Sequence, residues 1–106
     1  MESILIIDED ESFGETLEIF LADMGCRILR ANNGNIGLEI VESEHPDLVI
    51  TDYKMPQLNG LQVLKRIKEI DTNIQVIMLT AFEDMDSTIK AMQLGAYDYV
   101  EKLDLE

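Results

Sequence analysis

Five polar side chains that could do chemistry stand at or just beyond the ends of candidate strands in this sequence: Asp8, Glu9, Asp52, Thr80 and Lys102. If those strands are parallel, the side chains meet at one edge of a sheet, where unpaired like charges are costly unless a cation intervenes. Mg²⁺ suits such oxygen ligands, because it keeps several waters and typically uses a few carboxylates together with phosphate oxygens. The spacing therefore predicts a site for a metal ion and a phosphate group.

The predicted site requires a strand in front of each of these residues. Continuous apolar runs, typical of strands covered on both faces, occur at 4–7, 48–50 and 76–79. Two further candidate strands, 26–31 and 97–100, include charged side chains and are expected at the edges of the sheet.

Helical patterns separate the strands. Apolar residues recur at helix spacing in two segments, as Phe13, Leu17, Phe20, Leu21 and Met24, and as Leu61, Val63, Leu64 and Ile67. A weaker helix is expected at 34–44, before His45 and Pro46. Suitable stop and start residues are Gly25, Gly95, Asn59, Asp84 and Asp86. The alternation predicts a doubly wound α/β sheet, in which ligands bind beyond the carboxyl ends of the strands.

Length and charge restrict the possible classes of protein. The 106 residues suffice for one domain, which we assign to residues 1–106. The net charge of −14 disfavours direct binding of nucleic acid, and no apolar run is long enough to span a bilayer. The single cysteine, Cys26, cannot form an internal disulfide, and no export signal is evident. A cytoplasmic protein is therefore expected.

Four segments in order resemble the bacterial two-component response-regulator receiver family, and the match covers nearly the whole chain. The segments are Ile6 to Glu11 (IIDEDE), Pro46 to Pro56 (PDLVITDYKMP) with Gly60, Met78 to Ala81 (MLTA), and Gly95 to Lys102 (GAYDYVEK). Each segment alone is weak, whereas the four in this order are highly specific. The resemblance implies a five-stranded parallel sheet of flavodoxin-like order 2-1-3-4-5.

The resemblance also implies a role for each site residue. Asp52 would be the phosphoacceptor, and Mg²⁺, with Mn²⁺ as an alternative, would be held by Asp8, Glu9, Asp52 and the backbone carbonyl of Lys54. Thr80 and Lys102 would contact the phosphoryl group, Thr80 and Tyr99 would form the switch, and Lys54 and Phe82 would tune the lifetime of the phosphate.

The same resemblance implies a class of partner and activity. The donor would be a phosphohistidine on a sensor histidine kinase or phosphotransfer protein. The chain would catalyse its own phosphorylation and dephosphorylation, with no external substrate. The segment from Tyr97 to Lys102 resembles receivers of transcriptional activators, which predicts a downstream effector domain beyond Glu106.

The chain departs from the family pattern in two places. Leu103 follows Lys102 where receivers usually have proline in a cis peptide, and a cis bond to another residue costs about 2.5–4 kcal/mol, which favours a trans, shifted loop. The sequence also ends at Glu106, before the fifth helix that normally covers part of one face of the sheet. We therefore expect a truncated receiver that self-associates through exposed apolar surface, or is only marginally stable.

Other functions fit part of the sequence. The Asp8-Glu9-Asp10 spacing resembles haloacid-dehalogenase-like phosphatases, but that reading leaves the segment around Asp52 unexplained. A receiver-shaped interaction module that takes no phosphate is a second alternative. A flavin-binding protein fits least, because carboxylates rather than a glycine-rich loop follow the first strand. Asp10 and Glu11 are interpreted as acids at a helix start.

Overall fold

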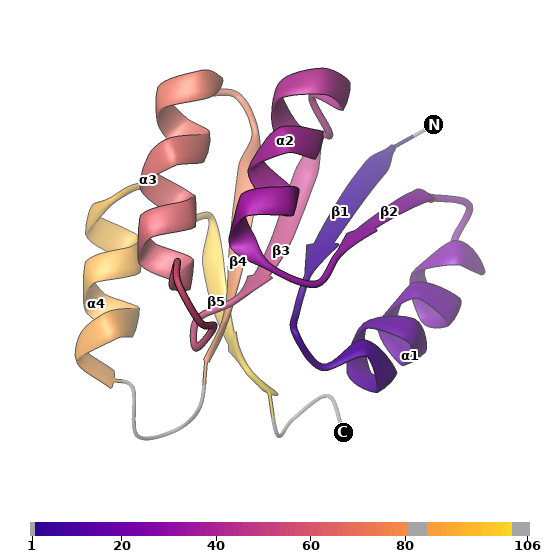
Figure 1. Cartoon of the computed structure of the whole chain (residues 1–106), viewed down its shortest axis with the longest axis horizontal. Helices are drawn as coiled ribbons and strands as arrows, with labels where there is room; N and C mark the ends of the chain where they lie inside the picture. The colour runs from indigo at the N-terminus through magenta and orange to yellow at the C-terminus, as the bar shows by residue number, and fades with distance from the viewer. Residues whose placement is uncertain (1, 81–84, 103–106) are drawn as a thin grey trace.

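The structure, a computed structural model, describes residues 2–80 and 85–102, in which strands and helices alternate (Figure 1). The strands are β1 (Ser3–Ile7), β2 (Arg27–Ala31), β3 (Leu48–Asp52), β4 (Gln75–Thr80) and β5 (Asp98–Glu101). The helices are α1 (Glu11–Ala22), α2 (Gly34–Glu44), α3 (Gly60–Ile70) and α4 (Met85–Gln93). The predicted alternation of strand and helix is therefore confirmed.

The five strands form one parallel sheet of order β2-β1-β3-β4-β5. The expected flavodoxin-like order is confirmed, and the three apolar runs are the central strands. Winding from β1 goes outward to β2 and then back to β3, so the direction reverses between β1 and β3. The carboxyl ends of the strands lie at the lower edge in Figure 1, and Asp8 and Asp52 stand at the ends of the two strands that flank this reversal.

Helix boundaries follow local sequence signals. Asn59 caps α3 in a capping box with Gln62, and the Asn33 side chain accepts the backbone N–H of Ile36 at the start of α2. His45 ends α2 in a left-handed conformation with φ of 44°, directly before Pro46. Asp10 caps α1, as expected of an acid at a helix start.

Alternating strand residues build two apolar layers on opposite faces of the sheet. One layer packs under α2, α3 and α4 and includes Leu5, Val49, Val76 and Met78. The other packs under α1 and includes Ile6, Ile50 and Leu79. Because α1 is the one helix described on the second face, apolar side chains of β4 and β5 there remain partly exposed.

Some boundaries differ from the sequence prediction. The helix α1 ends at Ala22 rather than at Met24, and Phe20 and Met24 are 66% and 68% exposed. Phe20 lies in the helix as predicted, whereas Met24 lies in the turn after it, and little of the described chain packs over either side chain. Asp52 and Thr80 are the last residues of their strands rather than the first beyond them. The predicted helix-start residue Asp84 lies outside the described residues.

None of the described helices is long and apolar enough to cross a membrane.

Candidate functional site

Asp52 is held at the end of β3 by its backbone neighbours. The N–H of Tyr53 donates to the carbonyl of Leu79 on β4 at 2.9 Å, and the N–H of Gly60 donates to the carbonyl of Tyr53 at 2.7 Å. These bonds tie the turn after Asp52 both to the sheet and to the first residue of α3. The Asp52 carboxylate is therefore presented from a fixed backbone and is largely buried.

Asp8 follows β1 and organises the start of α1. Its carboxylate Oδ1 accepts the backbone N–H of Asp10 at 2.9 Å, and Oδ1 of Asp10 in turn accepts the N–H of Phe13 at 3.1 Å. Asp8 is only 3% exposed. The first turn of α1 is thus built onto a buried carboxylate of the site.

Lys102 connects the two carboxylates. Its Nζ lies 2.9 Å from Oδ2 of Asp8 and donates to Oδ2 of Asp52 at 3.4 Å. Oδ2 of Asp8 is buried and accepts no hydrogen bond of good geometry, so the short contact with Nζ is an ion pair with poor alignment. Asp8, Asp52 and Lys102 therefore form one charged cluster, with an acceptor oxygen of Asp8 only partly satisfied.

Burial and charge shift the titration of this cluster. Burial and then the neighbouring Asp8 charge raise the pKa of Asp52 to about 6, although Lys102 opposes the shift. Burial lowers the pKa of Lys102, but the ion pairs with Asp8 and Asp52 outweigh it, so the pKa of this ammonium lies above its usual value. One ammonium leaves the two carboxylates short of positive charge.

The remaining predicted residues lie in different environments. Thr80 is buried at the end of β4, and Tyr99 is exposed on β5, paired in register with Met78. Lys54 is exposed in the loop after Asp52. Phe82, predicted to tune the phosphate lifetime, lies outside the described residues, and so does Leu103, whose peptide bond with Lys102 was predicted to be trans.

Glu9 is exposed to solvent, unlike Asp8 and Asp52. Within residues 2–80 and 85–102, no three acidic, histidine or cysteine side chains are gathered closely enough to hold a metal ion. The structure thus brings Asp8 and Asp52 together around Lys102 but does not bring in Glu9. Lys102 offsets part of the repulsion between the two buried carboxylates.

The chemistry of the donor set nevertheless fits a hard divalent cation. Asp8 offers a buried oxygen that lacks a well-formed hydrogen bond, and Asp52 is a second carboxylate beside it. Carboxylate oxygens with nearby water are the ligands that Mg²⁺ prefers. A cation would also relieve the repulsion that raises the pKa of Asp52.

Phe13 also belongs to this site, although the sequence indicated only an apolar residue of a helix. The Lys102 ammonium lies over its ring, 4.5 Å from the ring centroid. The helical pattern did predict that Phe13 faces the sheet, but it could not predict that an ammonium would reach that ring from β5.

Comparisons with known proteins agree with this arrangement. The family model described as "Response regulator receiver domain" matches residues 4–104. Sporulation initiation phosphotransferase F of Bacillus subtilis (strain 168) is 39% identical over 101 residues, which are 95% of this chain and 82% of that protein. A crystal structure of a response regulator receiver domain protein from Clostridium thermocellum superposes with a TM-score of 0.91 at 36% identity, covering 99% of this chain and 88% of that one.

Other relatives are much longer than this chain. Regulatory protein AtoC of Escherichia coli (strain K12) is 34% identical over 99 residues. The matched region covers 93% of this chain but only 22% of AtoC. The similarity to AtoC is therefore a similarity to one part of a larger protein.

Proposed function

The chain belongs to the response regulator receiver domain family, the receivers of two-component systems, and from this premise we propose that it accepts a phosphoryl group on Asp52 with the help of Mg²⁺. The observation that carries the proposal is the cluster at the sheet reversal, where Lys102 bridges the buried carboxylates of Asp8 and Asp52. A carboxylate held beside an ammonium provides both the attacking oxygen and part of the positive charge that phosphoryl transfer needs from a protein.

In the proposed transfer, a carboxylate oxygen of Asp52 attacks the phosphorus of a phosphohistidine. The new bond joins that oxygen to phosphorus, while the phosphorus–nitrogen bond breaks and its electron pair stays on the imidazole of the donor. Lys102 then pairs with a phosphoryl oxygen in place of a carboxylate. In dephosphorylation, the oxygen of a water molecule bonds to phosphorus while the bond between phosphorus and the Asp52 oxygen breaks. Its electron pair stays on Asp52 as the restored carboxylate, and the protons of the water leave with inorganic phosphate or pass to solvent.

The metal ligands in this proposal are Asp8, Glu9, Asp52 and the Lys54 carbonyl, with Mn²⁺ as a substitute for Mg²⁺. When bound, the cation neutralises charge on the phosphoryl oxygens. Glu9 is exposed and could approach once the cation is present, because the ion removes the repulsion between the acidic side chains.

Thr80 and Tyr99 form the proposed switch. Thr80 is buried at the carboxyl end of β4, where its hydroxyl could bond a phosphoryl oxygen, and Tyr99 is 43% exposed on the neighbouring strand. Movement of Thr80 toward the phosphate would open space for Tyr99 to turn inward, which changes the surface near α4 and β5. Lys54 and Phe82 tune the phosphate lifetime in the same proposal.

The direct test is intact mass spectrometry after incubation with acetyl phosphate and MgCl₂. We expect the mass of one phosphoryl group to be added in Mg²⁺ and not in EDTA, and fragmentation to place it on Asp52. An unchanged mass in Mg²⁺ would instead favour the alternative of an interaction module without phosphate. Steady turnover of a phosphomonoester that is lost in Asp8→Asn but survives Asp52→Asn would favour the haloacid-dehalogenase-like alternative.

Partners and setting are part of the same proposal. The donor is a sensor histidine kinase or phosphotransfer protein, and the longer relatives support an effector domain beyond Glu106 that regulates transcription. A cytoplasmic location stays a prediction.

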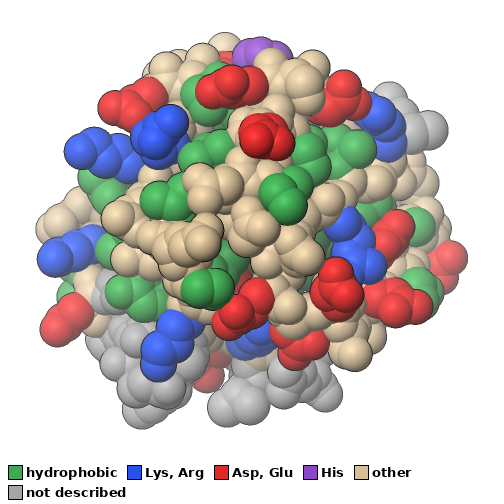
Figure 2. Space-filling model, viewed as in Figure 1, with side chains coloured by type: hydrophobic (Ala, Val, Ile, Leu, Met, Phe, Trp, Pro, Cys, Tyr) green, Lys and Arg blue, Asp and Glu red, His purple; other side chains and the backbone are tan. Residues whose placement is uncertain are grey.

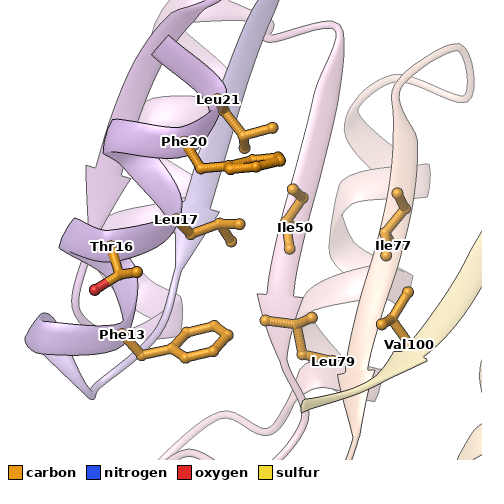
Figure 3. Close-up of a pocket in the computed structure, with 9 residues that line it drawn as sticks. All are labelled: Phe13, Thr16, Leu17, Phe20, Leu21, Ile50, Ile77, Leu79 and Val100. Carbon is orange, nitrogen blue, oxygen red and sulfur yellow. The ribbon is translucent and has the colours of Figure 1, made fainter. Parts of the chain in front are cut away.

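We also propose that this chain associates with a second copy through the face beside α1. A groove of about 410 Å³ lies between α1 and strands β3 to β5, and Figure 3 shows the side chains that line it, among them Leu17, Phe20, Ile77 and Val100. Phe20, which lines this groove from α1, is 66% exposed. Apolar side chains that are exposed on one copy can therefore be buried in the groove of the other copy.

Charge opposes this association and makes it testable. Each copy carries a net charge of −14, and Figure 2 shows acidic side chains distributed around one face of the molecule. Light scattering should therefore show mass above the monomer that increases with salt, because salt screens the repulsion. Phe20→Ser should shift the protein toward monomer, whereas Ile36→Ser, an exposed apolar residue on α2, should not. A wild-type monomer at all salt and protein concentrations would contradict the proposal.

A further inference from the structure

Phe13 lies between two parts of the molecule that differ in polarity. On one side its ring lines the apolar groove beside α1, as Figure 3 shows. On the other side the ring faces the ammonium of Lys102, with 4.5 Å between Nζ and the ring centroid. Phe13 is thus the side chain that separates the charged cluster from the groove.

The backbone of Phe13 is fixed to the same carboxylate that Lys102 contacts. Asp8 accepts the N–H of Asp10, and Asp10 accepts the N–H of Phe13, at 2.9 and 3.1 Å. The Lys102 ammonium contacts both the Phe13 ring and Asp8, with 2.9 Å between Nζ and Oδ2 of Asp8. The backbone of Phe13 is therefore tied to Asp8 through two hydrogen bonds that side-chain carboxylates accept from backbone N–H groups.

Lys102 itself has few restraints of its own. It follows the last residue of β5, and its long side chain has four rotatable bonds. Two carboxylates attract the ammonium, but attraction alone does not prevent Nζ from moving toward solvent, since the side chain is 21% exposed. The electron-rich face of an aromatic ring attracts a cation and also blocks its withdrawal toward the groove.

We propose that Phe13 is a positioning residue that holds the Lys102 ammonium against Asp8 and Asp52, and that its aromatic face, rather than its apolar bulk, does so. For phosphoryl transfer this inference rests on the proposed function, because Lys102 is there the group that meets the phosphoryl oxygens. The contact between Lys102 and Phe13 can be measured without phosphorylation.

The first experiment is a double-mutant cycle in EDTA. Urea unfolding is measured for wild type, Phe13→Leu, Lys102→Met and the double variant. Leu keeps an apolar side chain but has no aromatic face. We expect the unfolding equilibrium constants to show a coupling of roughly three- to tenfold between the two positions, as for a partly buried cation and aromatic ring. Coupling below twofold would overturn the inference, whether or not the protein is phosphorylated.

The second experiment measures the rate of phosphorylation by acetyl phosphate in Mg²⁺. Phe13→Leu should lower the rate by roughly three- to tenfold, and Phe13→Tyr should restore most of it, because tyrosine keeps the aromatic face and its hydroxyl has space in the adjacent groove. In the Lys102→Met background, Phe13→Leu should cause no further loss. Equal rates for Phe13→Leu and wild type would overturn the positioning role.

A third variant distinguishes loss of the aromatic face from a change in folding. Replacement of Phe13 by 3,4,5-trifluorophenylalanine nearly preserves the shape of the ring but withdraws electron density from its face. The fluorinated protein should lose about as much coupling and rate as Phe13→Leu while its unfolding stays cooperative. Retention of the full wild-type rate would show that bulk alone positions Lys102. If wild type takes no phosphate, the proposed function fails, and the EDTA cycle still decides whether Phe13 holds Lys102.

Discussion

Asp52→Asn is expected to abolish phosphorylation and, at the same time, to make the metal-free protein more stable at neutral pH. The amide lacks the carboxylate oxygen that must attack phosphorus, so no acyl phosphate forms. The amide also carries no charge, so it removes the buried carboxylate that repels Asp8. A residue whose loss ends activity but raises stability is typical of a functional site rather than of a structural one.

The size and sign of the stability change follow from the pKa of Asp52. It is raised from 3.8 to about 6, chiefly by burial and then by Asp8. Because the folded state holds this proton more tightly than the unfolded state, ionisation of Asp52 destabilises the folded protein. The destabilisation is complete above pH 6 and absent below about pH 4. Asp52→Asn should therefore add about 1–3 kcal/mol to the free energy of unfolding at pH 7, and this gain should disappear as the pH falls from 6 to 4.

Urea unfolding in EDTA across this pH range is the measurement. Glu42→Gln, an exposed residue on α2, removes one charge away from the site and serves as the control, with little expected effect. MgCl₂ should stabilise wild type more than Asp52→Asn, because the variant lacks one of the proposed ligands. A gain that persists at pH 4, or a phosphorylated Asp52→Asn protein, would contradict the assignment.

The positions of Asp8 and Asp52 in the fold could be predicted because they depend on strand ends. Parallel strands that are buried on both faces are largely apolar, so the carboxylates that follow each apolar run lie near the edge of the sheet. The order of the strands and the reversal between β1 and β3 then bring Asp8 and Asp52 together. Helix starts could also be predicted, because capping residues mark them in the sequence, as Asn59 does at the start of α3.

The contacts within the site could not be predicted in the same way. Glu9 and Asp8 are adjacent carboxylates in the turn after β1, and their residue types do not say which of the two is buried, whereas in the structure only Asp8 is. The reach of Lys102 to the Phe13 ring depends on side-chain conformations, which residue type and spacing do not specify. Similarly, helical periodicity places Phe20 on the same side of α1 as Leu17 but does not say what covers it, and Phe20 is exposed.

Gly60→Ala is expected to be strongly destabilising, because the methyl group would enter the turn that holds Asp52. A Cβ at Gly60 would lie 2.7 Å from the backbone oxygen of Asp52 and 2.8 Å from Cα of Tyr53, and neither backbone atom can move without shifting Asp52. We expect a loss of about 2–4 kcal/mol in the free energy of unfolding, together with slower phosphorylation.

Gly14→Ala is the matched control for Gly60→Ala, because both glycines are buried and belong to helices. At Gly14 the nearest atom to an added Cβ is the guanidinium tip of Arg30, at 3.0 Å, and the end of a flexible side chain can move aside. Alanine also favours the helical backbone by up to about 1 kcal/mol, so this variant should unfold within about 1 kcal/mol of wild type. Urea unfolding of the two variants compares them directly. Equal stabilities of the two variants would mean that the turn after Asp52 moves aside as easily as the Arg30 side chain. The site would then lack the fixed backbone that in-line phosphoryl transfer requires.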